Sequence, residues 1–216
     1  MTADVTSMRE AADQAFDQGL FETARREYLR AAVAQGKPSA EQLIEVLVAD
    51  RLAADSDRAH PTAEQAGMRE QKSFATAVRV LANGAPRPQE DLRRLGYAGG
   101  VIEPDEKRTA ELIATGDWLA AAAEPSALSD QVRAEVLTAL VEVGQVEPSR
   151  AYEAMKKADG VAPEVAAAFY RYAAEAYTRA EQPGFAAMAV AQHARQSVLA
   201  SSRASVGVAT TELGGR

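Results

Sequence analysis

The chain of 216 residues is long enough for one domain of ample size or for two small ones. Its net charge of −7 disfavours general attraction to nucleic acid phosphates, and the absence of cysteine excludes disulfides, thiol catalysis and cysteine-ligated zinc. Abundant alanine and few β-branched runs favour helix, so the composition predicts an all-α protein. Neither a secretory signal nor a membrane-spanning run is found, and we expect a cytoplasmic protein.

The stretch from Ala11 to Ala31 predicts two short helices that fold back on each other around Gly19. Spacings of 3 and 4 residues place small and aromatic side chains on one face of each helix. These residues are Ala11, Ala12 and Ala15 on the first helix, and Phe21, Ala24, Tyr28 and Ala31 on the second. The small alanines allow the two backbones to approach closely.

The run from Gly19 to Ala31 resembles the turn and second helix of a tetratricopeptide repeat. In that family a Gly, an aromatic residue, an Ala, a large residue and another Ala recur in this order, supplied here by Gly19, Phe21, Ala24, Tyr28 and Ala31. The match covers residues 9–31. It implies antiparallel helix pairs stacked in a short right-handed solenoid, with N-terminal repeats in residues 1–83.

Residues 84–104 are rich in Pro and Gly, and we predict a joint between two helical halves there. Residues 105–200 are predicted to hold C-terminal helical repeats. Three sets of residues in this part repeat spacings from the first helix pair: Gly116, Trp118 and Ala121; Ala151, Met155 and Ala158; and Ala187, Ala191 and Ala194. Residues 201–216 lack periodicity and are predicted to form a mobile tail.

Two aspartates and an arginine share one face of the first predicted helix, because Arg9, Asp13 and Asp17 are four residues apart. The resemblance implies that this face lines a groove that holds a partner segment. Because two of the three residues are acidic, we expect a partner with a basic segment. The alternative is a solvated face with a local ion pair.

Tyr170 and Tyr177 lie on the helix that is predicted to follow Pro163. Alignment with the repeat pattern makes them face the groove, where exposed tyrosines would serve as contact residues. The alternative is that both pack on a neighbouring helix or on a second subunit.

Sites for catalysis or for a bound group are not supported by the sequence. His60 lies near Asp55 and Asp57, but a metal site needs three or four ligands on a rigid frame. The stretch Gly96–Gly100 lacks the preceding strand of a phosphate loop and is followed by acidic residues. We therefore expect no catalytic residue, no metal and no cofactor.

The sequence is best interpreted as a non-catalytic interaction scaffold that binds a peptide or protein segment. Self-association through an exposed helical end is compatible with this interpretation. Two alternatives stay open: a regulator that senses a small molecule or peptide in a pocket near Trp118 and the tyrosines, and a helical enzyme with an unrecognised site.

Overall fold

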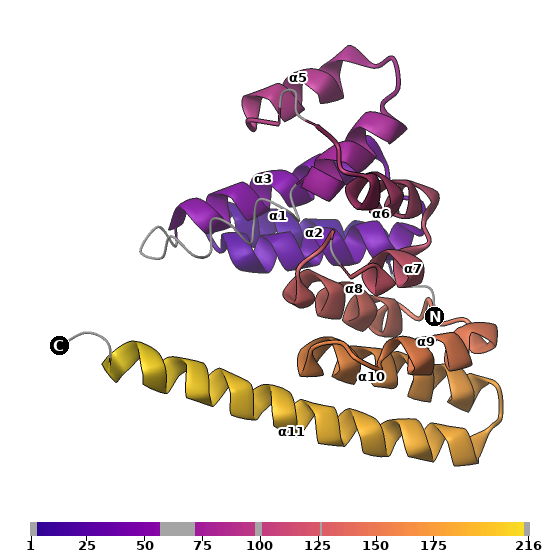
Figure 1. Ribbon diagram of the computed structural model, residues 1–216. Helices are drawn as coiled ribbons and strands as arrows, with labels where there is room; N and C mark the ends of the chain where they lie inside the picture. The colour runs from indigo at the N-terminus through magenta and orange to yellow at the C-terminus, as the bar shows by residue number, and fades with distance from the viewer. Residues whose placement is uncertain (1–3, 57–71, 98–100, 126, 214–216) are drawn as a thin grey trace. The chain divides into compact units, whose positions relative to one another are not determined.

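The computed structural model describes residues 4–56, 72–97, 101–125 and 127–213, with only the backbone described for 55–56 and 204–213. All regular structure in these residues is helical, which confirms the predicted all-α class (Figure 1). His60 and Asp57, which the sequence does not favour as metal ligands, lie outside the described residues, as do residues 98–100 of the glycine-rich stretch.

The chain divides into two compact units, Met1–Gln145 and Val146–Arg216. The first unit contains α1 (Val5–Asp17), α2 (Phe21–Gln35), α3 (Ala40–Ser56), helical residues 72–81, α5 (Pro86–Arg94), α6 (Pro104–Thr115), α7 (Trp118–Ala123) and α8 (Asp130–Glu142). The second contains the 3-10 turn η1 (Pro148–Arg150), α9 (Ala151–Lys157), α10 (Pro163–Arg179) and α11 (Pro183–Leu213). The predicted joint at 84–104 therefore lies inside the first unit, and the division falls after Gln145.

Helix α2 is the central element of the first unit, because it packs against α1, α3 and α8. Ala24, Ala32 and Val33 are completely buried on it. Ala12 and Ala15 of α1 are buried as the periodicity predicts, whereas Ala11 is exposed and was wrongly assigned to the packed face. Helices in stacked repeats contact their neighbours in sequence. The packing of α2 on α8 adds a contact between segments about a hundred residues apart.

The C-terminal end of α2 is held by two side chains from distant segments. The indole N–H of Trp118 donates to the carbonyl of Gly36 at 2.8 Å, and the amide of Gln145 donates to the carbonyl of Ala34 at 2.7 Å. These bonds satisfy carbonyls that the end of a helix leaves without partners. A Cβ on Gly116 would lie 2.6 Å from the Gly36 carbonyl oxygen, so this close approach requires glycine.

The second unit is built around α10, which packs against α9, η1 and α11. Its buried residues extend around most of the helix, including Val165, Phe169, Tyr172 and Ala176. A helix that is apolar on nearly all sides is covered on more than one side. The alignment with the repeat pattern predicted that one side of this helix faces a groove, so it did not predict helices on more than one side.

Helix α11 continues to Leu213, so residues 201–213 of the predicted mobile tail are helical. Ser201 and Ser202 donate their hydroxyl groups to the carbonyls of Ser197 and Val198, four residues earlier. Such bonds satisfy serine hydroxyls within the helix. The lack of periodicity did not predict this helix, because an amphipathic pattern arises only where one face of a helix is packed.

Helix α10 ends with a non-glycine residue in the left-handed region, Glu181, whose φ is 55°. The N–H of Gln182 donates to the carbonyl of Tyr177 at 2.9 Å, and the N–H of Glu181 to that of Thr178 at 3.1 Å. This bond pattern is the Schellman motif, in which the residue at the position of Glu181 is usually glycine. A side chain with a Cβ is strained there.

Replacement of Gly116 by alanine is expected to destabilise the first unit by about 3 kcal/mol, because it adds a backbone clash to the strain of a positive φ. Gly19→Ala is the matched control: Gly19 has φ 74° at the end of α1, and no atom lies within 4 Å of its added Cβ. It should lose only about 1 kcal/mol. Urea unfolding followed by the fluorescence of Trp118 measures both, and equal losses would contradict the close approach.

Replacement of Glu181 by glycine is expected to stabilise the second unit by up to about 1 kcal/mol, because glycine adopts positive φ without strain. Thermal unfolding followed by far-UV circular dichroism measures the gain. Glu181→Ala removes the same charge and retains the strained backbone. An equal gain in that variant would assign the effect to the lost carboxylate.

Candidate functional site

The three residues predicted on the acidic face of α1 are all partly or fully exposed, and two of them have partners within the unit. Arg9 forms an ion pair with Glu45 of α3. The hydroxyl of Tyr28 donates to the Asp13 carboxylate at 2.6 Å, and burial, followed by this bond, raises the pKa of Tyr28. Asp17 lies one turn further on and is exposed. Arg9 therefore pairs across to α3 and not with Asp13.

The two tyrosines predicted to face the groove are buried, so their predicted exposure is wrong. Tyr170 is 8% exposed, and its hydroxyl lies 3.5 Å from the Asp159 carboxylate. Tyr177 is 6% exposed and stacks on Phe185 of α11, with ring centroids 5.3 Å apart. Both rings are part of the packing around α10, in a different unit from α1.

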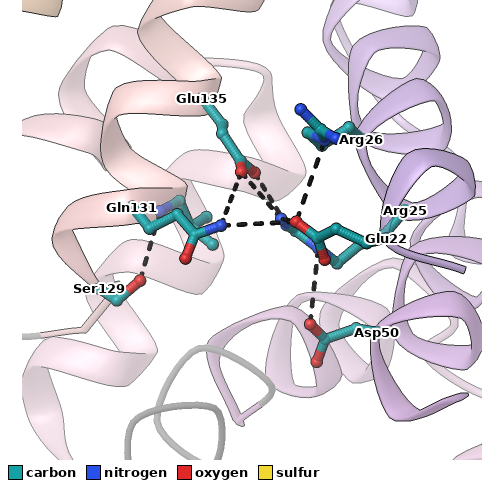
Figure 2. A network of polar contacts seen from close by, with 8 residues as sticks. Glu22, Arg25, Arg26, Asp50, Ser129, Gln131 and Glu135 are labelled. Atoms are coloured by element: carbon teal, nitrogen blue, oxygen red, sulfur yellow. Dashed lines mark hydrogen bonds and ion pairs between the residues drawn. The ribbon is translucent and has the colours of Figure 1, made fainter. Parts of the chain in front are cut away.

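A buried arginine holds three carboxylates together inside the first unit (Figure 2). The guanidinium of Arg25 is 4% exposed and lies 2.9 Å from Glu22 of its own helix. It also lies 2.8 Å from Glu135 of α8 and 3.7 Å from Asp50 of α3. Gln131 of α8 donates to Glu135 at 3.1 Å and completes the network.

The charges of this network stabilise one another. Burial alone would raise the pKa of Glu22, but hydrogen bonds and charge from Arg25 outweigh it and lower that pKa. Burial alone would lower the pKa of Arg25. The carboxylates of Glu22 and Glu135 outweigh this effect and raise that pKa. The lowered pKa keeps Glu22 ionised, not in the protonated state that an acid catalyst needs. We interpret the network as a structural connection between α2, α3 and α8.

The cavity beside Arg25 is too small for a substrate. It is lined by Arg25, Leu29, Val46, Leu47, Asp50, Phe74 and Val132, and its volume of about 10 Å³ accommodates about one water molecule. Trp118, near which a ligand pocket was predicted, is 1% exposed and already bonded to Gly36. Within the described part of the chain, no group of three or more His, Asp or Glu side chains is placed to hold a metal.

The largest concentration of exposed apolar side chains lies on α11. Half of the exposed large apolar residues in the described chain are on this helix: Phe185, Met188, Val190, Val198 and Leu199. Val198 is 66% and Val190 55% exposed. Neighbouring apolar side chains exposed on one helix mark interaction surfaces more often than scattered ones do. Even so, no helix among the described residues is long and apolar enough to cross a membrane.

Packing on α10 fixes which side of α11 is exposed. Ala189 is completely buried, and the Nδ1 atom of His193 lies 2.9 Å from the Ala167 carbonyl of α10. Ala187, Val190, Ala191, Ala194, Val198 and Ser201 form one part of the exposed side, and we call these six residues the outer face of α11. The outer face itself carries no charged side chain, and the exposed Arg195, four residues after Ala191, lies at its border.

Ala187, Ala191 and Ala194 repeat the spacing of three buried residues of α2, Ala24, Tyr28 and Ala31, but all three are exposed. The buried alanines of this helix are Ala186 and Ala189. A usable signal was nonetheless present. From Pro183 to Ser202 the only Asp, Glu, Lys or Arg is Arg195, in a chain that is 25% charged. A helix that is poor in charge on all sides normally has partners on more than one side.

Replacement of Arg25 by methionine is expected to destabilise the first unit by about 3 kcal/mol or more, because partly buried carboxylates lose their cation. Arg26→Met is the matched control, since Arg26 is 56% exposed and its pair with Glu22 contributes well under 1 kcal/mol. Urea unfolding followed by Trp118 fluorescence measures both losses, and a difference below about 1 kcal/mol would contradict the assigned role.

The same pair of variants should differ in acid. Because the pKa of Glu22 is below its ordinary value of 4.5 in the folded state, its contribution is complete above that pH and is lost as the pH falls through the folded pKa. The Arg25→Met variant lacks the cation that lowers this pKa, so its stability should fall less steeply in acid. A pH dependence identical to that of the Arg26→Met variant would contradict this.

Comparison of the chain with protein-family models, with curated proteins and with solved structures finds no match. The tetratricopeptide resemblance therefore stays a prediction, which rests on residues 9–31.

Proposed function

We propose that this protein is a non-catalytic interaction module that docks another protein on the outer face of α11. One observation carries the proposal: half of the exposed large apolar side chains of the described chain are on this helix, and the two most exposed of them, Val190 and Val198, are on its outer face. Covering a half-exposed valine or leucine stabilises a complex by on the order of 1 kcal/mol. The binding energy would therefore come from apolar burial along the helix, with few charge pairs.

The face suits a helical partner better than an extended strand. It follows α11 lengthwise, and its side chains are small or β-branched at spacings of 3 and 4 residues. Small side chains allow the axis of a second helix to come close, and helices pack by ridges and grooves at these spacings. An extended strand, in contrast, needs unpaired backbone groups, which a helix does not present.

The exposed face of α1 supports a second docking surface for a basic segment. Arg9 forms its ion pair with Glu45, so a single arginine stands beside three carboxylates, Glu45, Asp13 and Asp17. Association with a basic segment there would be steered by charge and weakened by salt. Its strength would depend on Asp17 more than on Asp13, which already accepts a hydrogen bond from Tyr28.

Site-specific photo-cross-linking in the native cell tests the proposal. A photoreactive amino acid replaces Ala191 on α11, Asp17 on α1 or, as a control, Lys107 on the exposed side of α6. We expect a cross-linked protein product at Ala191, lost when Val198→Glu is added, and none at Lys107. Products at Asp17 alone would move the docking surface to α1, and none at either position would overturn the interaction module.

A further inference from the structure

The outer face of α11 contains a symmetric pattern. Ala187, Val190, Ala194, Val198 and Ser201 follow one another at spacings of 3, 4, 4 and 3 residues, and all five are exposed. At 3.6 residues per turn they lie within an arc of about 80°. From either end, the order is a small residue, a valine, an alanine, a valine and a small residue.

We propose that a second copy of this chain is the partner of the outer face, with the two α11 helices antiparallel and Ala194 at the two-fold axis. The inference rests on the proposed docking function of that face. In a two-fold interface, every contact occurs twice: if residue i of the first copy contacts residue j of the second, then residue j of the first copy contacts residue i of the second. Val190 of each copy then packs beside Val198 of the other, and Ala187 beside Ser201.

The sizes of the side chains fit this arrangement. Ala187, Ala194 and Ser201 are seven residues apart, so small side chains recur along the middle of the face every two turns. They allow the two helices to approach closely, and the valines fill the spaces between them. The rotation of α11 is set by Ala189 and His193 on the α10 side, so the symmetric face points away from α10.

The charge distribution makes this helix the least repulsive place for two copies to meet. Two copies of a chain with a net charge of −7 repel each other on average. Residues 183–203, however, carry Arg195 and Arg203 and no carboxylate, and the outer face itself is uncharged. Contact along α11 therefore brings no carboxylates of this segment together, and it buries no ionised group of the outer face.

The size of the face predicts a weak, reversible dimer. The outer face has six residues on each copy. Interfaces of stable complexes use about 20–30 residues on each side. The outer face supplies fewer, so the dimer should dissociate on dilution.

Sedimentation velocity of the full chain over a range of concentrations tests the dimer. Wild type should shift from monomer to dimer as the concentration rises. Ala194→Glu places like charges together at the axis and should weaken the dimer at least tenfold, and so should Ala194→Lys. A mixture of these two variants should recover the dimer, because only then do opposite charges meet. Leu199→Glu, on another side of the helix, should leave the dimer intact.

Engineered cysteines test the register, since the chain has no cysteine of its own. Ala194→Cys should oxidise to a disulfide-linked dimer by itself, because position 194 meets its own copy. Val190→Cys should cross-link in a mixture with Val198→Cys much faster than alone. If Val190→Cys cross-links faster alone than in the mixture, the proposed register is wrong. If Ala194→Cys forms dimers but no disulfide, the two-fold axis does not pass through Ala194.

The remaining outcomes separate this inference from the proposed function. If wild type stays monomeric at all concentrations while Ala191 cross-links to a different protein, the second copy is excluded and the docking surface is retained. If it stays monomeric and Ala194→Glu lowers the melting temperature, the face is covered within one chain and both proposals fail. Dimerisation that persists in Ala194→Glu would place the self-contact elsewhere.

Discussion

Burial of one guanidinium group determines how the first unit is assembled. Arg25 has donors in a fixed planar arrangement, and a buried arginine is tolerated only when carboxylates satisfy them. These carboxylates come from α2 itself, from α3 and from α8. Three helices must therefore be in place together before Arg25 can be buried. Trp118 and Gln145 add the same requirement at the end of α2, since both reach its last carbonyls from the later part of the unit.

The local features of the fold could be predicted from the sequence, and its long-range contacts could not. Helical periodicity and glycine predicted α1, α2 and the turn between them, because these depend on residues a few positions apart. Nothing in the sequence distinguishes Glu135 from a solvated surface carboxylate, although it pairs with Arg25 from 110 residues away. The boundary after Gln145 was missed for this reason, because proline and glycine content marks turns and not the extent of packing.

The candidate site shows the same limit. Spacing along one helix placed Arg9, Asp13 and Asp17 on a common face, but the pairing of Arg9 with Glu45 depends on how α3 packs. Tyr170 and Tyr177 were misjudged because helices cover α10 on more than one side. For α11, alanines fall on all sides, so they do not fix its rotation about its own axis. Larger groups fix it: the stacking of Phe185 on Tyr177, and the contact of His193 with Ala167.

The distance along the chain between Arg25 and Glu135 has a consequence for biosynthesis. At a translation rate of roughly 5–20 residues per second, Glu135 is made about 5 to 20 seconds after Arg25. During that interval the helices that have left the ribosome lack one carboxylate of the buried network and the two side chains that cap α2. The first helix pair therefore waits as an incomplete, aggregation-prone intermediate that a chaperone could bind. For the same reason, a fragment cut before α8 is a poor choice for recombinant expression, even though it contains residues 9–31, on which the predicted repeat resemblance rests.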